Sequence, residues 1–524
     1  MDHFAISTIH PGNWQRLLRF QTGVSKKMAN ISLLPAVQAF MARRHGQFID
    51  GNATADSATA TIEVVNPSSK EVITAVHQAS DADVEQAVKS AHDAFKGTWH
   101  ATSPARRGEL LNRLADLMQE NREELAQIES LCSGKLIGLS RAFEIDYSIA
   151  FLRYYAGWAT KIQGRTMSLS LPSAQGEQYT GFTLRQPLGV VAGIVPWNFS
   201  VMIAVWKFGS ALACGCTAVI KPSEFTPLTM LRVAELAIEA GIPAGVLNVV
   251  NGNGRTVGPA LIAHPMVSKV TFTGSVPTGT GVGVAAMQAG LKHVTLELGG
   301  KNPAGFLRDF PVDKTVDGII EAAYLHQGEV CASAERFYIH RSRIDDVMEA
   351  LPKKLSAMRI GNALDESANF GPLANRTHFE KILSVFSKAK QEGGDFIYGG
   401  TAADEAGFFV KPTAVLAHSQ ADTIMTEETF GPVASFLAYD DHEEMLQYMN
   451  DSRFGLTASV WTNDLSHALR LVPQVEAGTV WVNMHNYIDP AMPFGGVKSS
   501  GIGREFGEAF IEHFTELKSV IIRY

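Results

Sequence analysis

Between residues 190 and 273, short runs rich in β-branched residues alternate with longer helix-like stretches. The strand-like runs cover residues 190–195, 218–221, 246–250 and 269–273, and the helix-like stretches cover residues 201–213, 227–240 and 257–263. Strands that alternate with helices form right-handed βαβ units and a parallel, doubly wound sheet. Such a sheet binds its ligands at the carboxyl ends of its strands. The pattern therefore predicts an α/β domain with a ligand site at that edge.

A second region of the same kind follows Cys331. It has strand-like runs at residues 337–340, 433–438 and 457–461 and helix-like stretches at residues 344–358 and 377–391. Ahead of the first region, the residue pattern predicts a strand at 61–65 and helices at 81–95 and 103–130. The chain is thus expected to contain two α/β domains.

Two segments have a different pattern. Residues 178–185 alternate polar and apolar side chains, as a half-exposed antiparallel strand does, and residues 518–524 form a β-rich run with no partner nearby in the sequence. Exposed strand edges have to be covered or paired. We therefore expect these segments to pair across a subunit interface.

Length and charge narrow the class of protein. At about 150 residues per domain, the 524 residues correspond to roughly two to four domains. Lys and Arg number 45 against 53 Asp and Glu, a net charge of −8, which argues against a nucleic-acid partner.

Four cysteines are too few for a disulfide scaffold, so we expect a reducing, cytoplasmic location. Cys214 and Cys216 have no matching pair of ligands, so no metal is expected.

Neither a membrane span nor a secretory signal is expected. The apolar stretch 189–220 is interrupted by Pro196, Asn198 and Lys207 before it reaches the length that a spanning helix needs. Residues 1–46 carry six Lys or Arg against the single acid Asp2. This composition is typical of a transit peptide or of a plain N-terminal extension, and we favour the extension.

Cys331 and Glu297 lie in unusual surroundings. Glu297 ends an apolar strand just before two glycines, where an acid is costly to bury, and Cys331 lies in a loop 34 positions later. A thiol in such a loop can act as a nucleophile with a carboxylate as its base. On spacing alone, the favoured interpretation is a buried structural cysteine and a capped or salt-bridged glutamate.

A candidate phosphate loop follows the strand at 269–273. The standard G-x-G-x-x-G pattern is missing, but Gly274, Ser275 and Gly279 open the next helix, where backbone N–H groups can bind phosphate. Taken alone, an ordinary turn between strand and helix explains the same residues.

Seven motifs occur in the order and at about the spacing of the aldehyde dehydrogenase superfamily, which residues 48–524 resemble. The motifs are PWNF at 196–199, IKPSE at 220–224, FTGS at 272–275, LELGGKNP at 296–303, GEVC at 328–331, EETFGP at 427–432 and PFGG at 493–496. With SRAFE at 140–144 and the final β-run, the chain looks most similar to bacterial phenylacetaldehyde dehydrogenases. The resemblance implies an α/β fold with a doubly wound cofactor domain, an α/β catalytic domain and a small antiparallel bridging element.

The resemblance also implies a mechanism. Cys331 would be the nucleophile, and its thiohemiacetal oxyanion would be stabilised by the Asn198 amide and the backbone N–H of Cys331. Hydride loss would leave a thioester, and Glu297 would activate the water that hydrolyses it. A turn-forming role is the alternative for Asn198 when its tripeptide is considered alone.

NAD is the expected cofactor. In similar enzymes, residues matching Lys221 and Glu224 bind the adenosine ribose, and a carboxylate at Glu224 would repel the 2′-phosphate of NADP. For Trp197, the alternative role is packing. For Lys221 and Glu224, the alternative is that both are ordinary solvated side chains at the surface. The expected cofactor residues are Trp197, Lys221, Glu224, Gly254, Gly258, Phe272, Gly274, Ser275, Gly279, Leu298, Glu428 and Phe430.

The expected aldehyde channel is large and apolar. Such a lining favours a bulky hydrophobic aldehyde, and phenylacetaldehyde in particular, over charged or phosphorylated ones. At least two of these residues are expected to be ordinary core. The residues are Tyr147, Phe199, Met202, Trp206, Leu325, Ile488 and Phe494.

Three positions depart from the family pattern. Glu329 replaces the commoner Gln, Ser333 follows the proposed nucleophile by two residues, and Ser200 stands where Pro is common. If the Glu329 carboxylate is ionised and close, it should raise the pKa of the Cys331 thiol.

The expected domains follow from the motif order. They are an N-terminal extension at 1–46, an NAD-binding domain at 47–158 and 187–298, a catalytic domain at 299–500, and an oligomerisation element at 159–186 and 501–524. A homotetramer or homodimer is expected.

Three alternatives to the expected function remain. They are oxidation of another aliphatic or aromatic aldehyde, a relative that passes the acyl group to coenzyme A, and a catalytically silent structural or binding homologue. Glu297 argues against acyl transfer, because a water-activating base favours hydrolysis.

Overall fold

A twisted eight-stranded sheet is built mainly from residues 190–297. The computed structural model describes residues 31–54, 60–171 and 175–524, so most of the basic N-terminal segment lies outside the described residues. Five parallel strands form the centre of the sheet in the order β9-β8-β7-β10-β11. These strands are β7 (Val190–Ile194), β8 (Thr217–Lys221), β9 (Leu247–Val249), β10 (Val267–Thr273) and β11 (His293–Glu297).

Short antiparallel strands extend both edges of this sheet. They are β1 (Phe48–Ile49) and β2 (Asn52–Ala53) at one edge and β23 (Gly501–Ile502) at the other. Strand β23 thus belongs to the first sheet, although we expected residues 501–524 in the oligomerisation element. Helix α2 (Pro35–Met41) likewise packs against helix α6 through buried Val37 and Phe40, so packed structure begins before the expected boundary at residue 47.

Helices cover both faces of the first sheet. Alternate side chains of β8 show why: Ala218 and Ile220 join one apolar cluster, and Val219 joins the other. One face carries α5 (Pro104–Glu120), α6 (Arg122–Ser133), α8 (Asp146–Trp158), α9 (Ser200–Ala213) and α10 (Leu228–Glu239). The other carries α3 (Asp81–Lys96), α11 (Gly254–Ala263) and α12 (Val276–Gln288).

The single helix expected at 103–130 is two helices, α5 and α6. The side chain of Asn121 donates to the Leu117 carbonyl and ends the first of them.

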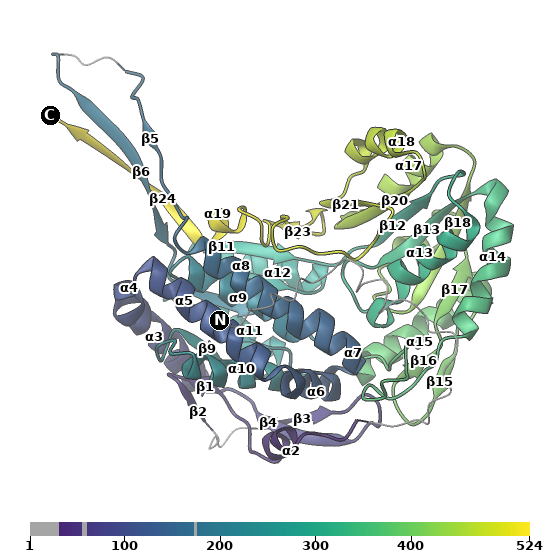
Figure 1. Cartoon of the computed structure of the whole chain (residues 1–524), viewed down its shortest axis with the longest axis horizontal. Helices are drawn as coiled ribbons and strands as arrows, with labels where there is room; N and C mark the ends of the chain where they lie inside the picture. Colours follow the sequence, from purple (N-terminus) through teal and green to yellow (C-terminus); the bar gives the residue numbers. More distant parts are fainter. Residues whose placement is uncertain (1–30, 55–59, 172–174) are drawn as a thin grey trace, which may run out of the picture.

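A seven-stranded sheet forms the second half of the molecule (Figure 1). Its parallel strands are β12 (Asn302–Phe306), β13 (Ala334–His340), β17 (Thr413–Leu416), β18 (Val433–Tyr439), β20 (Thr457–Trp461) and β21 (Thr479–Val482), with β14 (Asp395–Tyr398) antiparallel at one edge. Its faces are covered by α13 (Val312–Tyr324) with α14 (Arg341–Ser356), and by α15 (Arg376–Gln391) with α17 (His442–Asn450).

An antiparallel arm projects from the first half of the molecule (Figure 1). Strand β6 (Tyr179–Pro187) pairs on one side with β24 (Thr515–Arg523) and on the other with β5 (Thr166–Met167). Strands β6 and β24 thus pair with each other within one chain, and pairing of this arm across a subunit interface stays a prediction. In the part of the chain that the structure describes, no helix is long and apolar enough to cross a membrane.

Candidate active site

The carboxyl ends of the strands in the first sheet face the amino ends of the strands in the second sheet. Strand order reverses between β7 and β10 of the first sheet, so the loops after these strands diverge and leave a crevice there. Glu297 ends β11 at the same edge, while Cys331 lies just before β13 of the second sheet. The carboxyl edge of the first sheet thus meets the amino edge of the second.

Cys331 follows a strained turn. His326 and Gln327, in the 3₁₀ helix Leu325–Gly328, both have left-handed backbone angles, with φ of 46° and 52°. Such angles are costly for residues with a side chain and persist only where surrounding contacts impose them. A side chain at Gly328 would meet the Gly431 carbonyl at 2.3 Å. The loop before Cys331 is therefore packed directly against the loop that carries Glu428 and Phe430.

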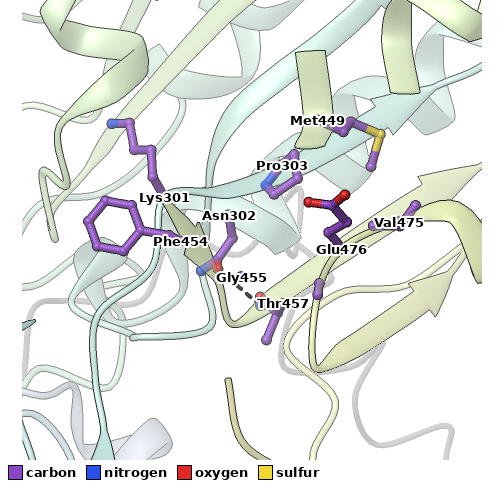
Figure 2. Close-up of a pocket in the computed structure, with 10 residues that line it drawn as sticks. Lys301, Asn302, Pro303, Met449, Phe454, Gly455, Thr457, Val475 and Glu476 are labelled. Carbon is purple, nitrogen blue, oxygen red and sulfur yellow. Dashed lines mark hydrogen bonds between the residues drawn. The ribbon is translucent and has the colours of Figure 1, made fainter. Parts of the chain in front are cut away.

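Polar side chains of the second sheet hold the Cys331 loop. The Asn302 amide donates to the carbonyls of Cys331 and Ser333 at 2.7 and 2.8 Å and accepts from the Thr457 backbone N–H (Figure 2). The Thr457 hydroxyl donates to the Ala332 carbonyl at 2.8 Å. The cavity beside Asn302 measures only about 10 Å³, the volume of a single water at most, so it is no aldehyde site.

Glu297 is a buried acid with an oxygen that lacks a partner. Its side chain is 4% exposed, and Oε1 makes no hydrogen bond to the residues that the structure describes. Burial, with the charge of Glu505, raises the pKa of Glu297 to about 8, and Lys207 and Arg504 partly oppose the increase. A carboxyl group with its pKa near neutrality and a free oxygen can exchange protons with a nearby water.

Asn198 lies in the loop between β7 and α9 and spans the two sheets. Its side-chain amide donates to the Glu329 carbonyl at 2.9 Å, and its own carbonyl accepts from His326 Nε2 at 3.1 Å. The amide nitrogen carries two hydrogens, and one remains for an oxygen in the crevice. The structure thus brings Asn198, Glu297 and the loop of Cys331 together.

The Cys331 thiol has a raised pKa, but Glu329 is not the reason. Burial raises the pKa of Cys331 most, followed by the charges of Glu297 and Glu428. Glu329 is buried, which raises its own pKa well above the usual value, and its Oε1 accepts the Ala374 N–H. Glu329 is not among the charges that raise the pKa of Cys331, so the condition on which its expected effect depended is not met.

The expected ribose residues lie together at the end of β8. Lys221 Nζ is 3.2 Å from Glu224 Oε2, and burial lowers the pKa of Lys221 while Glu224 opposes the change. A Cβ at Gly254 would lie 3.9 Å from Lys221 Nζ, so Gly254 lies beside this buried ammonium group. Gly258 lies one turn further along α11, near Ile194.

The turn after β10 opens directly into helix α12. Ser275 precedes the helix, and its hydroxyl bonds Thr278 rather than the first backbone N–H groups. Gly274 lies against the ring of Phe272, and Gly279 lies against Leu298 so closely that a side chain there would clash at 2.2 Å. The expected phosphate residues therefore form one closely packed turn.

Glu428 and Phe430 lie on the loop that packs against Gly328. Glu428 Oε1 accepts the Gly300 N–H at 2.9 Å, and burial raises the pKa of Glu428 to about 7. Phe430 has a left-handed backbone, and its ring packs edge-on against Trp197 with the centroids 5.5 Å apart. Trp197 therefore has a packing role, which was the alternative expected for it. It also contacts the loop that is expected to bind the cofactor.

All seven expected channel residues belong to the apolar cluster whose margin includes Cys331. They differ in exposure. Phe199, Met202, Trp206 and Phe494 are almost fully buried. Tyr147, Leu325 and Ile488 are partly buried, as is Cys331. These three residues keep accessible surface that a substrate could contact. The other four are part of the buried apolar core.

Several residues at this site were not singled out from the sequence. Lys207 Nζ is 2.9 Å from Glu505 Oε1, and this pair flanks Glu297. Glu335 accepts the backbone N–H groups of Thr429 and Phe430 and so fixes the Glu428 loop. In the sequence, Lys207 is a charged residue within the apolar stretch 189–220. We interpreted it only as evidence against a membrane span.

This combination of fold and site matches one family of enzymes. The family model described as "Aldehyde dehydrogenase family" matches residues 54–520. The chain therefore belongs to the aldehyde dehydrogenase family and is an oxidoreductase with the α/β fold expected from the sequence.

Individual relatives are similar over nearly the whole chain. A phenylacetaldehyde dehydrogenase of Pseudomonas fluorescens is 43% identical over 96% of this chain and 100% of its own length. An aldehyde dehydrogenase of Bacillus cereus, solved as an NAD⁺ complex, is 39% identical with a TM-score of 0.91 over 94% of this chain and 99% of that one. A betaine aldehyde dehydrogenase of Staphylococcus aureus, also in complex with NAD⁺, is 34% identical with a TM-score of 0.89 over 93% and 96% of the two chains.

Proposed function

We propose that this enzyme oxidises a hydrophobic aryl-alkyl aldehyde, phenylacetaldehyde in particular, to its carboxylic acid with NAD. The observation that carries the proposal is the convergence of the Cys331 loop, the Asn198 amide and the buried Glu297 carboxyl group between the two sheets. A nucleophile, an oxyanion donor and a base are what aldehyde oxidation through a thioester requires.

In the proposed reaction, the Cys331 thiol gives up its proton to water, and its sulfur bonds to the aldehyde carbon as the C=O π electrons move to oxygen, which forms the thiohemiacetal oxyanion. Asn198 Nδ2 and the backbone N–H of Cys331 donate to the oxyanion that develops. Loss of a hydride then converts the thiohemiacetal to a thioester, and the hydride acceptor would be supplied by the nicotinamide of a bound cofactor. Glu297 then removes a proton from the water that attacks the thioester carbon, and the acid leaves as the Cys331 thiol is restored.

The residues present are suited to a dinucleotide. Lys221 is a buried cation paired with Glu224, Ser275 leaves the start of α12 without a side-chain cap, and Glu428 is a partly buried acid beside Gly299 and Gly300. We propose that these residues hold the adenosine ribose, the pyrophosphate and the nicotinamide ribose, respectively. Glu224 makes NAD the preferred form, because its carboxylate accepts from a ribose 2′-hydroxyl and repels a 2′-phosphate.

Glu224→Gln should relax the preference for NAD. Removing the negative charge should lower the ratio of kcat/KM with NAD to kcat/KM with NADP by about tenfold, equivalent to about 1.4 kcal/mol. Steady-state kinetics with both cofactors measure the ratio. Glu239→Gln, which neutralises an exposed acid on α10, is the matched control and should leave it unchanged. An unaltered ratio in Glu224→Gln would contradict the role given to this carboxylate.

The substrate proposal rests on the channel residues and on the relative from Pseudomonas fluorescens. Tyr147, Leu325 and Ile488 pack against the same apolar cluster as Cys331 and offer aromatic and aliphatic surface that suits an aryl-alkyl group. The relative named for phenylacetaldehyde is 43% identical to this chain.

A panel of aldehydes tests this specificity. We expect kcat/KM for phenylacetaldehyde to exceed that for betaine aldehyde or succinic semialdehyde by at least about a hundredfold, because a charged group would lose its hydration in an apolar channel. NADH absorbance in initial-rate assays measures this. Preference for hexanal would favour an aliphatic substrate, and no NADH with any aldehyde would favour a catalytically silent homologue.

We also propose that the enzyme is a homotetramer or homodimer of the cytoplasm. The arm formed by β6 and β24 exposes Leu184, Leu517 and Ile521, with 44%, 56% and 64% of their surfaces accessible. Apolar side chains on a projecting strand pair are suited to burial against another subunit. A reducing location follows from the role of Cys331, whose oxidation would stop the reaction.

A further inference from the structure

Three fully buried charged residues lie behind the turn that carries Asn198. Lys135 pairs with Glu129 at 3.2 Å and with Glu144, and none of the three side chains has accessible surface. Removing charged groups from water is expensive, and apolar residues can often replace buried ion pairs without loss of stability. Stability alone is therefore a poor explanation for this cluster, to which we refer as the Lys135 cluster.

Each member of the Lys135 cluster contacts the chain directly after Asn198. Glu144 Oε1 accepts the backbone N–H groups of Val201 and Met202, both at 2.8 Å. Glu129 Oε2 accepts the hydroxyl of Ser200 at 2.8 Å. Lys135 Nζ lies 4.4 Å from the centre of the Phe199 ring. Four consecutive residues, from 199 to 202, are thus attached to one buried set of charges.

The attachment replaces an ordinary helix cap. Helix α9 begins at Ser200, and its preceding residue, Phe199, supplies no side-chain cap. A Ser, Asp or Asn before the helix would satisfy one of these N–H groups more simply. Glu144 instead reaches the helix from the π-helix Ser140–Ile145, a distortion that occurs frequently at functional sites. Capping from a separate element fixes the turn relative to the rest of the fold.

We propose that Glu129, Lys135 and Glu144 are positioning residues that hold the 198–202 turn so that the Asn198 amide faces the thiohemiacetal oxygen on Cys331. This inference rests on the proposed function, because it acts through the oxyanion role of Asn198. A displacement of about 1 Å in a reacting group can reduce a rate about a hundredfold. A rigid attachment of this turn therefore contributes to the rate of hydride loss rather than to cofactor binding.

Two hydroxyl groups provide a matched test. Ser200 and Thr229 both donate to Glu129 Oε2, at 2.8 and 2.9 Å, but only Ser200 belongs to the Asn198 turn, whereas Thr229 lies on α10. In stopped-flow measurements of the first NADH turnover, Ser200→Ala should reduce the rate about fivefold to tenfold. Thr229→Val should leave the rate within about twofold of wild type. The KM for NAD should stay within about twofold in both variants.

A double-variant cycle separates positioning from a general structural role. If the cluster acts through Asn198, adding Ser200→Ala to Asn198→Ala should cause no further loss, because the group that is positioned is already absent. Glu144→Ala removes both helix N–H contacts and should reduce the first-turnover rate by more than Ser200→Ala does. The Ser200 and Thr229 variants carry the test whether or not Glu144→Ala folds.

Two results would overturn the proposal. One is an equal loss of rate in Ser200→Ala and Thr229→Val, which would indicate a general effect of perturbing Glu129. The other is multiplicative losses in the cycle, which would indicate that Ser200 acts independently of Asn198. Failure of the proposed function is distinguishable from both, because wild-type enzyme would then form no NADH with any aldehyde.

Discussion

Cys331→Ala should abolish aldehyde oxidation, with kcat/KM reduced at least about a thousandfold. No thiohemiacetal forms without the sulfur, and no other residue described at the site is placed as a nucleophile in this mechanism. The loop should keep its conformation, because Asn302 binds the backbone carbonyl of residue 331 and not its side chain. NADH formation in initial-rate and first-turnover assays measures the loss.

Cys214→Ala is the control for this prediction. Cys214 is a buried cysteine at the end of α9, away from the loop of Cys331, and its replacement should leave kcat/KM within about twofold. Turnover by Cys331→Ala at a tenth of the wild-type rate or more would refute the thioester mechanism.

Glu297→Gln should separate the two halves of the reaction. The first turnover of NADH should remain close to wild type, because thiohemiacetal formation and hydride loss need no base at Glu297. Steady-state turnover should fall about a hundredfold to ten-thousandfold, since the amide cannot remove a proton from water. A rapid burst of NADH followed by a slow phase is the expected stopped-flow record, and equal loss of both phases would contradict this assignment.

The pH dependence of wild type follows from the raised pKa of Glu297. With a pKa of about 8, the carboxyl group is mostly protonated at pH 7 and becomes an effective base only as the pH rises. Where hydrolysis limits turnover, kcat should therefore increase with pH and level off above about pH 8. In Glu297→Gln this increase should disappear, and an unchanged profile would assign the titration to another group.

Much of the fold was predictable because the central strands are short, β-branched and separated by helices. The strand expected at 269–273 is the carboxyl part of β10, and the helix expected at 81–95 is one residue shorter than α3. Side-chain pattern determines these elements locally. The pairing of β6 with β24 was not predictable in the same way, because the partners are far apart in the sequence and no local signal relates them.

Motif order predicted which residues belong to the candidate site, but not how their environments act on them. The sequence placed Glu329 beside Cys331 and suggested a charge effect, whereas burial raises the pKa of Glu329 itself and its Oε1 accepts the Ala374 N–H. The Lys135 cluster was missed for the same reason. Its members lie on α6, on the π-helix and between them, and only tertiary packing reveals that both carboxylates reach the start of α9.

The arm and the eighth strand also set an order of events during translation. Arg185 on β6 bonds Glu512, 327 positions later in the chain, and β23 joins β11 from a similarly late segment. Glu505, which flanks Glu297, is synthesised in the same interval. A nascent chain can fold most of its first sheet early, yet Glu505 joins the surroundings of Glu297 only after β11 and the whole second sheet have been synthesised. Ribosome-bound intermediates that end before residue 505 should therefore lack one of the charges that raise the pKa of Glu297.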